Sequence, residues 1–317
     1  MQGGPKECYS NLGNCSSSFR GWVDGKGGLR MERCSCHTAQ VTRPDDSLQD
    51  WGRVADAWGR HADAIRRHSA PVTKWLVGKL DPKRGQTILE LASGPGDTGF
   101  AVAGELEAEG CLISSDFAPE MVEVARRRAA GFGLENIEFK TLDAQAIDLP
   151  DDLVDGVVCR FGFMLMPDPD AALSECRRVL RPAGRVVFAT WGPPERNPWI
   201  MALGMAMLQH GYPPPGDPSG PGGIFSMADP ERVGTMLLKA GFAEVDLDEV
   251  QISHRFPTFD EYWNLQSEVA GPLAVLITSL SSEERSSVKN TVRESVGAFT
   301  EGSGLALPGV AVVASAS

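Results

Sequence analysis

Residues 87–99, TILELASGPGDTG, run from an apolar strand through a glycine-rich turn into a helix. Gly94 and Gly96 let the backbone turn sharply and approach a ligand closely, where a Cβ would collide with it. The first N–H groups of the following helix have no partner inside that helix, so they point at the same place. The segment therefore predicts a loop that holds a nucleotide-type cofactor.

Two carboxylates bear on which cofactor this loop holds. Asp116 ends the next apolar run, 111–116, where it can accept both hydroxyls of a ribose. The loop and this acid fit NAD as well as S-adenosylmethionine, because the glycine spacing also matches the dinucleotide fingerprint. Glu90 favours S-adenosylmethionine, since a carboxylate repels a pyrophosphate and attracts an ammonium and a sulfonium. An NAD(P)-dependent oxidoreductase and a non-catalytic cofactor-binding scaffold stay open as alternatives.

Composition excludes several classes of protein. A chain of 317 residues, 42% of them hydrophobic, can bury one substantial core and a smaller appendage. Its net charge of −12 argues against nucleic acid as a partner. No apolar run reaches the ~20 residues that a membrane span needs. Cys111, Cys159 and Cys176 lie in apolar patterns and are expected to be buried free thiols, which points to the cytoplasm.

The sequence before residue 46 differs from the rest. Residues 1–45 carry no periodic apolar pattern and predict a disordered extension, so the folded domain is expected over 46–317. Residues 34–37, Cys-Ser-Cys-His, look like half of a metal site, but no second ligand cluster follows, and no metal is predicted. Residues 51–80 read as one or two amphipathic helices, with a break expected at Pro71.

From residue 87 onward, strand patterns alternate with helix patterns. This alternation predicts an α/β fold: a Rossmann-like, doubly wound, mostly parallel seven-stranded sheet with helices on both faces. The expected strands are 87–92, 111–116, 137–142, 156–163, 185–190, 243–250 and 310–314. The expected helices are 98–109, one from Pro119 that closes at Gly131, 169–180, 199–209 and one that starts at Asp229 and ends at Gly241. In such sheets the ligand lies beyond the carboxyl ends of the strands, which is where Glu90, Asp116, Asp143 and Arg160 fall.

Two segments exceed what the sheet needs, 191–228 and 254–304. The second is expected to hold two helices, each opened by an apparent capping box at Thr258 and Ser281. Three interpretations stay open for these insertions: a helical lid over the substrate, a structural appendage, or the surface of a homodimer.

Several stretches in the right order resemble the class I S-adenosylmethionine-dependent methyltransferases, in particular the branch of the ubiquinone/menaquinone C-methyltransferases. The resemblance covers residues 50–190 well and 229–317 loosely. It rests on 88–96 (ILELASGPG), 115–121 (SDFAPEM), 142–144 (LDA), 160–169 (RFGFMLMPDP) and 175–184 (ECRRVLRPAG).

The resemblance implies a role for each matching residue. Glu90, Ala92, Gly94 and Gly96 would frame the methionine end of the cofactor, and Asp116 would hold the ribose. Phe117 or Met121 would line the adenine. Asp143 would accept a hydrogen bond from the adenine amino group, with Ala144 beside it. Trp58 would close over the cofactor, and Arg160 would face the methionine part or the acceptor. Ala92 departs from the family, which often has glycine there.

The implied activity is methyl transfer to a small, aromatic or apolar acceptor. An activated sulfonium needs little more than an acceptor held in line, which can supply about 7–11 kcal/mol of rate enhancement. A general base would help a phenol or ring carbon. Arg160 and His254 are the weak catalytic candidates. Arg160 could instead pair with Glu90 or Asp168, Asp143 could cap a helix, and His68 is expected to face solvent.

Overall fold

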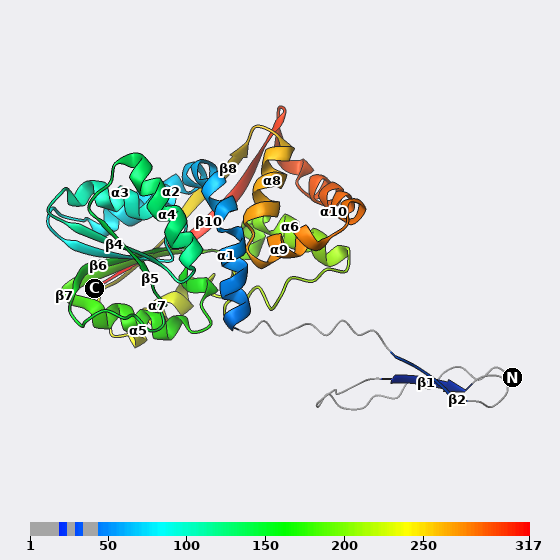
Figure 1. Ribbon diagram of the computed structural model, residues 1–317, viewed down its shortest axis with the longest axis horizontal. Coiled ribbons are helices and arrows are strands. Elements are labelled where there is room, and N and C mark those ends of the chain that lie inside the picture. The colour runs from blue at the N-terminus through cyan, green and yellow to red at the C-terminus, as the bar shows by residue number, and fades with distance from the viewer. Residues whose placement is uncertain (1–18, 24–28, 34–43) are drawn as a thin grey trace. The chain divides into compact units, whose positions relative to one another are not determined.

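The computed structural model describes residues 19–23, 29–33 and 44–317, in a chain that divides into two units, 1–40 and 41–317. In the first unit, β1 (Phe19–Val23) pairs antiparallel with β2 (Leu29–Arg33) (Figure 1). The sequence predicted no strand there. The Cys-Ser-Cys-His motif at 34–37 lies outside the described residues.

The second unit is built on one sheet. Along its main path the strand order is β5-β4-β3-β6-β7-β10-β8, and the short β9 (Thr300–Glu301) pairs with β10. All neighbours from β5 to β7 are parallel, whereas β10 runs antiparallel to both β7 and β8. The mostly parallel α/β fold is therefore confirmed. The strands are β3 (Thr87–Leu91), β4 (Cys111–Asp116), β5 (Ile137–Thr141), β6 (Val154–Arg160), β7 (Leu180–Trp191), β8 (Val245–Phe256) and β10 (Gly304–Ala316).

Helices cover both faces of this sheet (Figure 1). One face carries α2 (Ala62–Leu80), α3 (Asp97–Leu106) and α4 (Pro119–Phe132); the other carries α5 (Pro169–Val179) and α7 (Pro230–Lys239). The helix from Pro119 does not close at Gly131 as predicted. It continues to Phe132, because the residue that adopts the left-handed conformation of a helix end is Gly133, with φ 69°.

The expected break at Pro71 is wrong. The first helix, α1 (Pro44–Arg60), ends before His61, and α2 then runs through Pro71 without interruption. A proline inside a helix removes one hydrogen bond to the preceding turn. Pro71 is exposed, and so is Arg67, the residue whose carbonyl loses its partner in the helix. The buried side chains of the helix, Val72 and Leu76 among them, hold it to the sheet despite this loss.

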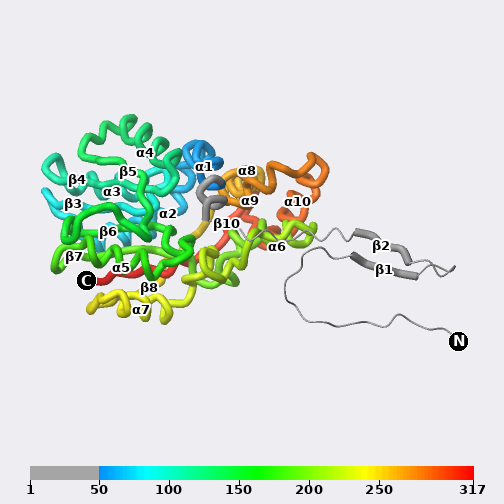
Figure 2. The backbone as a smooth tube through the Cα atoms, turned by 60° about the horizontal axis from the view of Figure 1, so that its bottom comes forward, coloured from blue at the N-terminus to red at the C-terminus, as the bar shows by residue number. Residues whose placement is uncertain are grey.

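A second group of helices gathers beside the sheet, around the ends of β8 and β10 (Figures 1 and 2). It consists of α6 (Pro198–Gln209), α8 (Phe259–Val269), α9 (Pro272–Ser279) and α10 (Ser282–Ser295), and is called the cap below. Its own apolar core is centred on buried Tyr262 and Trp263. Residues 254–304 thus hold three helices where two were predicted. The capping box at Ser281 is confirmed, while Thr258 accepts the N–H of Glu261 without the reciprocal bond.

Several strands differ in length from the prediction. The strand expected over 156–163 ends at Arg160, and 163–165 form the short helix η1 (Phe163–Leu165). Two further short helices are η2 (Pro194–Arg196) and η3 (Gly297–Phe299). β7, β8 and β10 are longer than predicted. Ala311 of β10 lies opposite both Trp191 and Val250, so residues 251–256 continue past the end of β7 and pair with β10 alone.

Among the helices that the structure describes, none is at once long and apolar enough to cross a membrane.

Candidate functional site

The glycine-rich loop between β3 and α3 is held in a strained shape. Ala92, Gly94 and Gly96 all have positive φ, at 51°, 52° and 90°. A side chain at Gly94 would touch the Trp58 ring of α1, since a Cβ there would lie 3.8 Å from the indole. The Trp58 ring therefore lies against the loop at Gly94.

Glu90, near the end of β3, is buried beneath this loop. Its carboxyl group accepts the N–H of Gly99 at 2.6 Å and the hydroxyl of Ser114 at 2.7 Å. Burial raises the pKa of Glu90 to about 8, although these two hydrogen bonds oppose the shift. Glu90 thus anchors the start of α3 to the sheet, and at neutral pH its neutral form is favoured.

Asp116, at the end of β4, reaches back to the same loop. One of its oxygens accepts the N–H of Gly94 at 2.9 Å, and the other accepts the N–H of Ala118 at 3.1 Å. Burial raises the pKa of Asp116 to about 6. A carboxylate oxygen can accept more than one hydrogen bond, so Asp116 keeps capacity for the hydroxyls of a ligand.

The structure places the other residues that were predicted to contact the adenosine group in different surroundings. Phe117 is 36% exposed at the surface, whereas Met121 is 3% exposed and packs between α1 and α4. Of the two, only Phe117 is free to line a ligand in this conformation. Asp143 caps no helix: its Oδ1 accepts the N–H of Gln145 at 2.9 Å in a turn, with Ala144 buried beside it.

Three buried polar atoms around the loop have no hydrogen-bond partner among the described residues: Ser93 Oγ, Asp97 Oδ2 and Thr98 Oγ1. The other oxygen of Asp97 pairs with Arg128 at 2.8 Å. Buried polar atoms are nearly always hydrogen-bonded in native proteins, so an unpartnered group of them calls for a ligand or water. None of these three residues was predicted as a site residue, although Ser93 directly precedes Gly94, and Asp97 and Thr98 directly follow Gly96.

Arg160 ends β6 on the same side of the sheet. Its Nη1 donates to the hydroxyl of Ser69 and, at 3.2 Å, to that of Thr73, both on α2. Neither Glu90 nor Asp168, the carboxylates considered from the sequence, is paired with it in the structure. Burial lowers the pKa of Arg160, while the charges of Asp97 and Glu90 oppose this. Within the part of the chain that the structure describes, no carboxylate thus pairs directly with this cation.

An aromatic row extends from Arg160 toward the cap. The Phe161 ring stacks on Trp191 at the end of β7, with centroids 3.8 Å apart. Trp191 meets Trp199 of α6 edge-on at 5.0 Å, and Trp199 stacks on His254 at 3.9 Å. His68 of α2 packs edge-on against His254 at 5.3 Å, so it does not simply face solvent. One run of rings thereby joins His254 to Phe161, the residue that follows Arg160.

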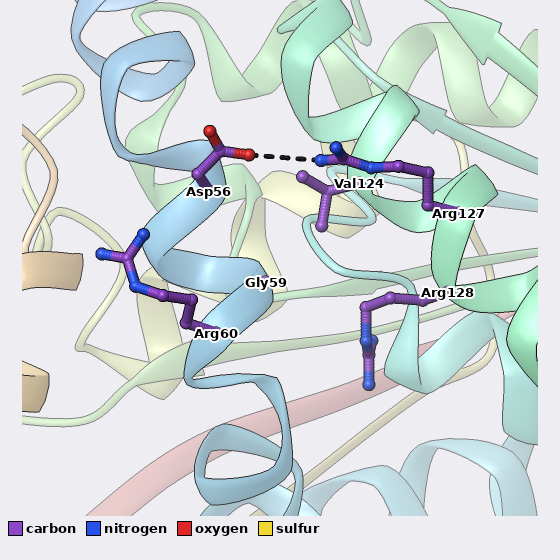
Figure 3. Close-up of a pocket in the computed structure, with 6 residues that line it drawn as sticks. All are labelled: Asp56, Gly59, Arg60, Val124, Arg127 and Arg128. Carbon is purple, nitrogen blue, oxygen red and sulfur yellow. Dashed lines mark hydrogen bonds and ion pairs between the residues drawn. The ribbon is translucent and has the colours of Figure 1, made fainter.

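A hollow of about 390 Å³ opens between α1 and α4 (Figure 3). It is lined by Asp56, Gly59, Arg60, Val124, Arg127 and Arg128. Each of its arginines already has a carboxylate partner: Arg127 pairs with Asp56, Arg60 with Glu268, and Arg128 with Asp97. The hollow is therefore a surface feature beside the loop, and no binding role is assigned to it. Within the described ranges, no group of three potential metal ligands is found.

This chain is similar to known methyltransferases. A family model described as a methyltransferase domain matches residues 82–209. A demethylmenaquinone methyltransferase of Thermus thermophilus is 42% identical over 117 residues, 37% of this chain and 50% of that protein. One from Deinococcus radiodurans is 33% identical over 165 residues, 49% of this chain and 67% of that protein. The aklanonic acid methyltransferase DauC of a Streptomyces species is 30% identical over 149 residues, covering 44% and 66%.

The matches span about half to two thirds of the length of these relatives. Among solved structures, the YcgJ protein of Bacillus subtilis superimposes with a TM-score of 0.53 at 19% identity, covering 77% of this chain and 96% of that one. A putative methyltransferase from an antibiotic biosynthesis pathway of Anabaena variabilis gives 0.55 at 12% identity, covering 76% and 95%. At these identities the structural matches establish the fold.

Proposed function

The chain belongs to the class I S-adenosylmethionine-dependent methyltransferases, and from this membership we propose that it methylates a small aromatic or apolar acceptor. The carrying observation is the set of unpartnered buried atoms Ser93 Oγ, Asp97 Oδ2 and Thr98 Oγ1 at the glycine loop. They meet the needs of an ammonium and a carboxylate, which the methionine end of the cofactor presents. S-adenosylmethionine, when bound, supplies a methyl group activated by a sulfonium.

The residues around the loop would each bind a different part of the cofactor. Asp116 would receive the ribose hydroxyls, Phe117 would cover the adenine, and Asp143 would accept from its amino group. These assignments are supported by their position at the carboxyl ends of β4 and β5, where ligands of open α/β sheets bind. Trp58, over Gly94, would exclude water from the reacting centre.

The acceptor side is supported by the aromatic row and Arg160. Directly beyond β6, the half-buried Phe161 ring stacks on buried Trp191, and Arg160 carries one positive charge at the end of the same strand. Planar aromatic molecules with an electron-rich oxygen suit such a surface. The demethylmenaquinone and aklanonic acid methyltransferases among the relatives are named for acceptors of a related kind.

Location and assembly stay predictions. Cys111, Cys159 and Cys176 are free thiols, which favours a reducing compartment such as the cytoplasm. A homodimer would use exposed apolar side chains, of which Met205 and Leu208 on α6 are the most suitable in the cap.

Calorimetry with S-adenosylmethionine, S-adenosylhomocysteine and NADPH tests the proposed function. We expect micromolar binding of the two adenosyl ligands and none of NADPH. Asp116→Asn should weaken adenosyl binding by about tenfold or more, since a hydrogen bond to a charged group contributes roughly 1.5–3 kcal/mol. Asp246→Asn, at an exposed acid paired with Lys79, is the matched control and should bind as the wild type does. Binding of NADPH alone, or of no ligand, would refute the proposal.

A further inference from the structure

His254 is a buried polar residue that the proposed cofactor site leaves unexplained. It lies on β8 between Ile252 and Phe256, whose alternating side chains share its buried face. Its side chain is 2% exposed, and neither ring nitrogen has a hydrogen-bond partner among the described residues. Leaving a buried donor or acceptor unpaired costs free energy, so an orphaned imidazole suggests a ligand that completes it.

The position of His254 places it on the acceptor side of the site. β8 is parallel to β6 and β7, so its carboxyl end points the same way as those that carry Arg160 and Trp191. His254 lies four residues beyond Val250, which is level with Trp191 across β10. The imidazole therefore stands beyond the edge of the parallel sheet, above the ends of the strands where ligands bind.

The aromatic row joins His254 to the loop. Phe161 keeps its ring on Trp191 with a backbone φ of 63°, a conformation that is strained for a bulky residue. Such strain tends to occur where function requires it. At the other end, Gly309 of β10 makes room for the rings, because a Cβ there would lie 2.8 Å from Nε2 of His254 and 3.0 Å from Nε1 of Trp199.

The surroundings keep His254 neutral. The titratable group packed against it is His68, whose Nε2 donates to the carbonyl of Arg255 at 3.0 Å. The other neighbours are the indoles of Trp191 and Trp199. Burial holds the pKa of His254 well below its usual value. A neutral imidazole offers one N–H donor and one nitrogen acceptor, which suits recognition of an oxygen better than it suits taking up a proton.

We propose that Phe161 and Trp191 form the binding surface for a planar acceptor, which takes the place of the Trp199 indole, and that His254 selects acceptors that carry a hydroxyl or carbonyl oxygen. This inference rests on the proposed function, and it assigns His254 a role in specificity. This role does not require His254 to act as a general base.

Trp199 covers the imidazole in the conformation described. Its side chain is partly exposed, and its Nε1 makes a long hydrogen bond of 3.4 Å to Oδ1 of Asn197. For the acceptor to reach His254, the indole has to leave its stack on the imidazole, and the long hydrogen bond to Asn197 opposes this little. The remaining rings, Phe161 and Trp191, stay stacked and need not move.

The test compares two probes of nearly equal size, 1-naphthol and 1-methylnaphthalene, which differ in the oxygen. Their dissociation constants are measured with the full chain saturated with S-adenosylhomocysteine. The wild type should prefer 1-naphthol by about tenfold, the scale of one hydrogen bond to a buried unpaired group. His254→Phe should lose this preference while its melting temperature rises, because two unpaired polar atoms leave the interior. His210→Phe, at an exposed histidine bonded to Thr291, is the matched control and should keep the preference.

Two further readouts exclude a merely structural role. His254→Gln, which retains a donor and an acceptor, should restore part of the preference for 1-naphthol. In protein with ¹⁵N-labelled histidine, 1-naphthol should shift the ring nitrogen signals of His254, and 1-methylnaphthalene should not. An unchanged preference in His254→Phe, no preference in the wild type, or unshifted signals would overturn the inference. Failure to bind S-adenosylhomocysteine would instead overturn the proposed function.

Discussion

At the scale of single residues, Glu90 gives the protein a pH-dependent stability. Its pKa is about 8 in the folded state and near 4.5 in the unfolded chain, so the folded state binds more protons between these values. The free energy of unfolding contributed by Glu90 is therefore largest below pH 4.5 and decreases as the pH rises through 8. Glu90→Gln should remove this dependence and stabilise the protein at pH 8.5, by about 1–3 kcal/mol. Urea unfolding at pH 6 and 8.5 measures it.

Glu175→Gln is the matched control, because the partner of Glu175 is Arg178, whose hydrogen bond lowers the pKa of that carboxyl. The stability it contributes is present at neutral pH and lost on acidification, which is the opposite sign. An equal pH dependence in Glu90→Gln and the wild type would show that Glu90 is ionised in the folded protein.

At the scale of elements, α2 shows that a proline in the sequence does not by itself determine where a helix ends. Pro71 predicts a helix boundary, yet the burial of Val72 and Leu76 against the sheet outweighs one lost hydrogen bond. Pro71→Ala should therefore raise the free energy of unfolding by about 1–3 kcal/mol. Pro119→Ala, at the first turn of α4 where no such bond is missing, should change it little. Calorimetry compares the two; a less stable Pro71→Ala would show that the proline fits the shape of α2.

In the candidate site too, local patterns could be predicted from the sequence, whereas contacts that depend on packing could not. Strand and helix periodicity predicted the parallel sheet and its glycine loop, and Asp116 could be placed because it ends a strand. The partners of Arg160 could not, since Ser69 and Thr73 lie some ninety positions earlier on a helix that only packing brings alongside. The length of β8 was equally hidden, because residues 251–256 pair with β10 beyond the sheet. Their alternation, with His254 between apolar neighbours, was nevertheless visible.

At the scale of the whole folded unit, α1 connects the sheet to the cap. Trp58 covers Gly94 with its ring and donates from Nε1 to the carbonyl of Val269, at the end of α8, at 3.0 Å. Trp58→Phe keeps a ring over the loop but loses that hydrogen bond, which contributes about 1 kcal/mol. We expect S-adenosylhomocysteine to bind about threefold to tenfold more weakly and the amides of α8 and α9 to exchange faster, as measured by calorimetry and hydrogen exchange.

Trp51→Phe is the comparison for this change, since Trp51 meets Trp58 edge-on at 6.0 Å and the bond to Val269 stays in place. Equal exchange rates in the two variants would mean that the hydrogen bond does not couple the cap to the loop.

The position of β10 in the sheet affects how the protein folds during its synthesis. Among the described strands it is last in sequence, yet it lies between β7 and β8 and is the strand that connects them. During synthesis on the ribosome, one edge of β7 stays unpaired until β10 has been made, more than a hundred residues later. Such an edge is a template for pairing with other chains. The nascent protein is therefore most exposed to aggregation just before residues 304–316 emerge, when chaperone protection has its greatest value.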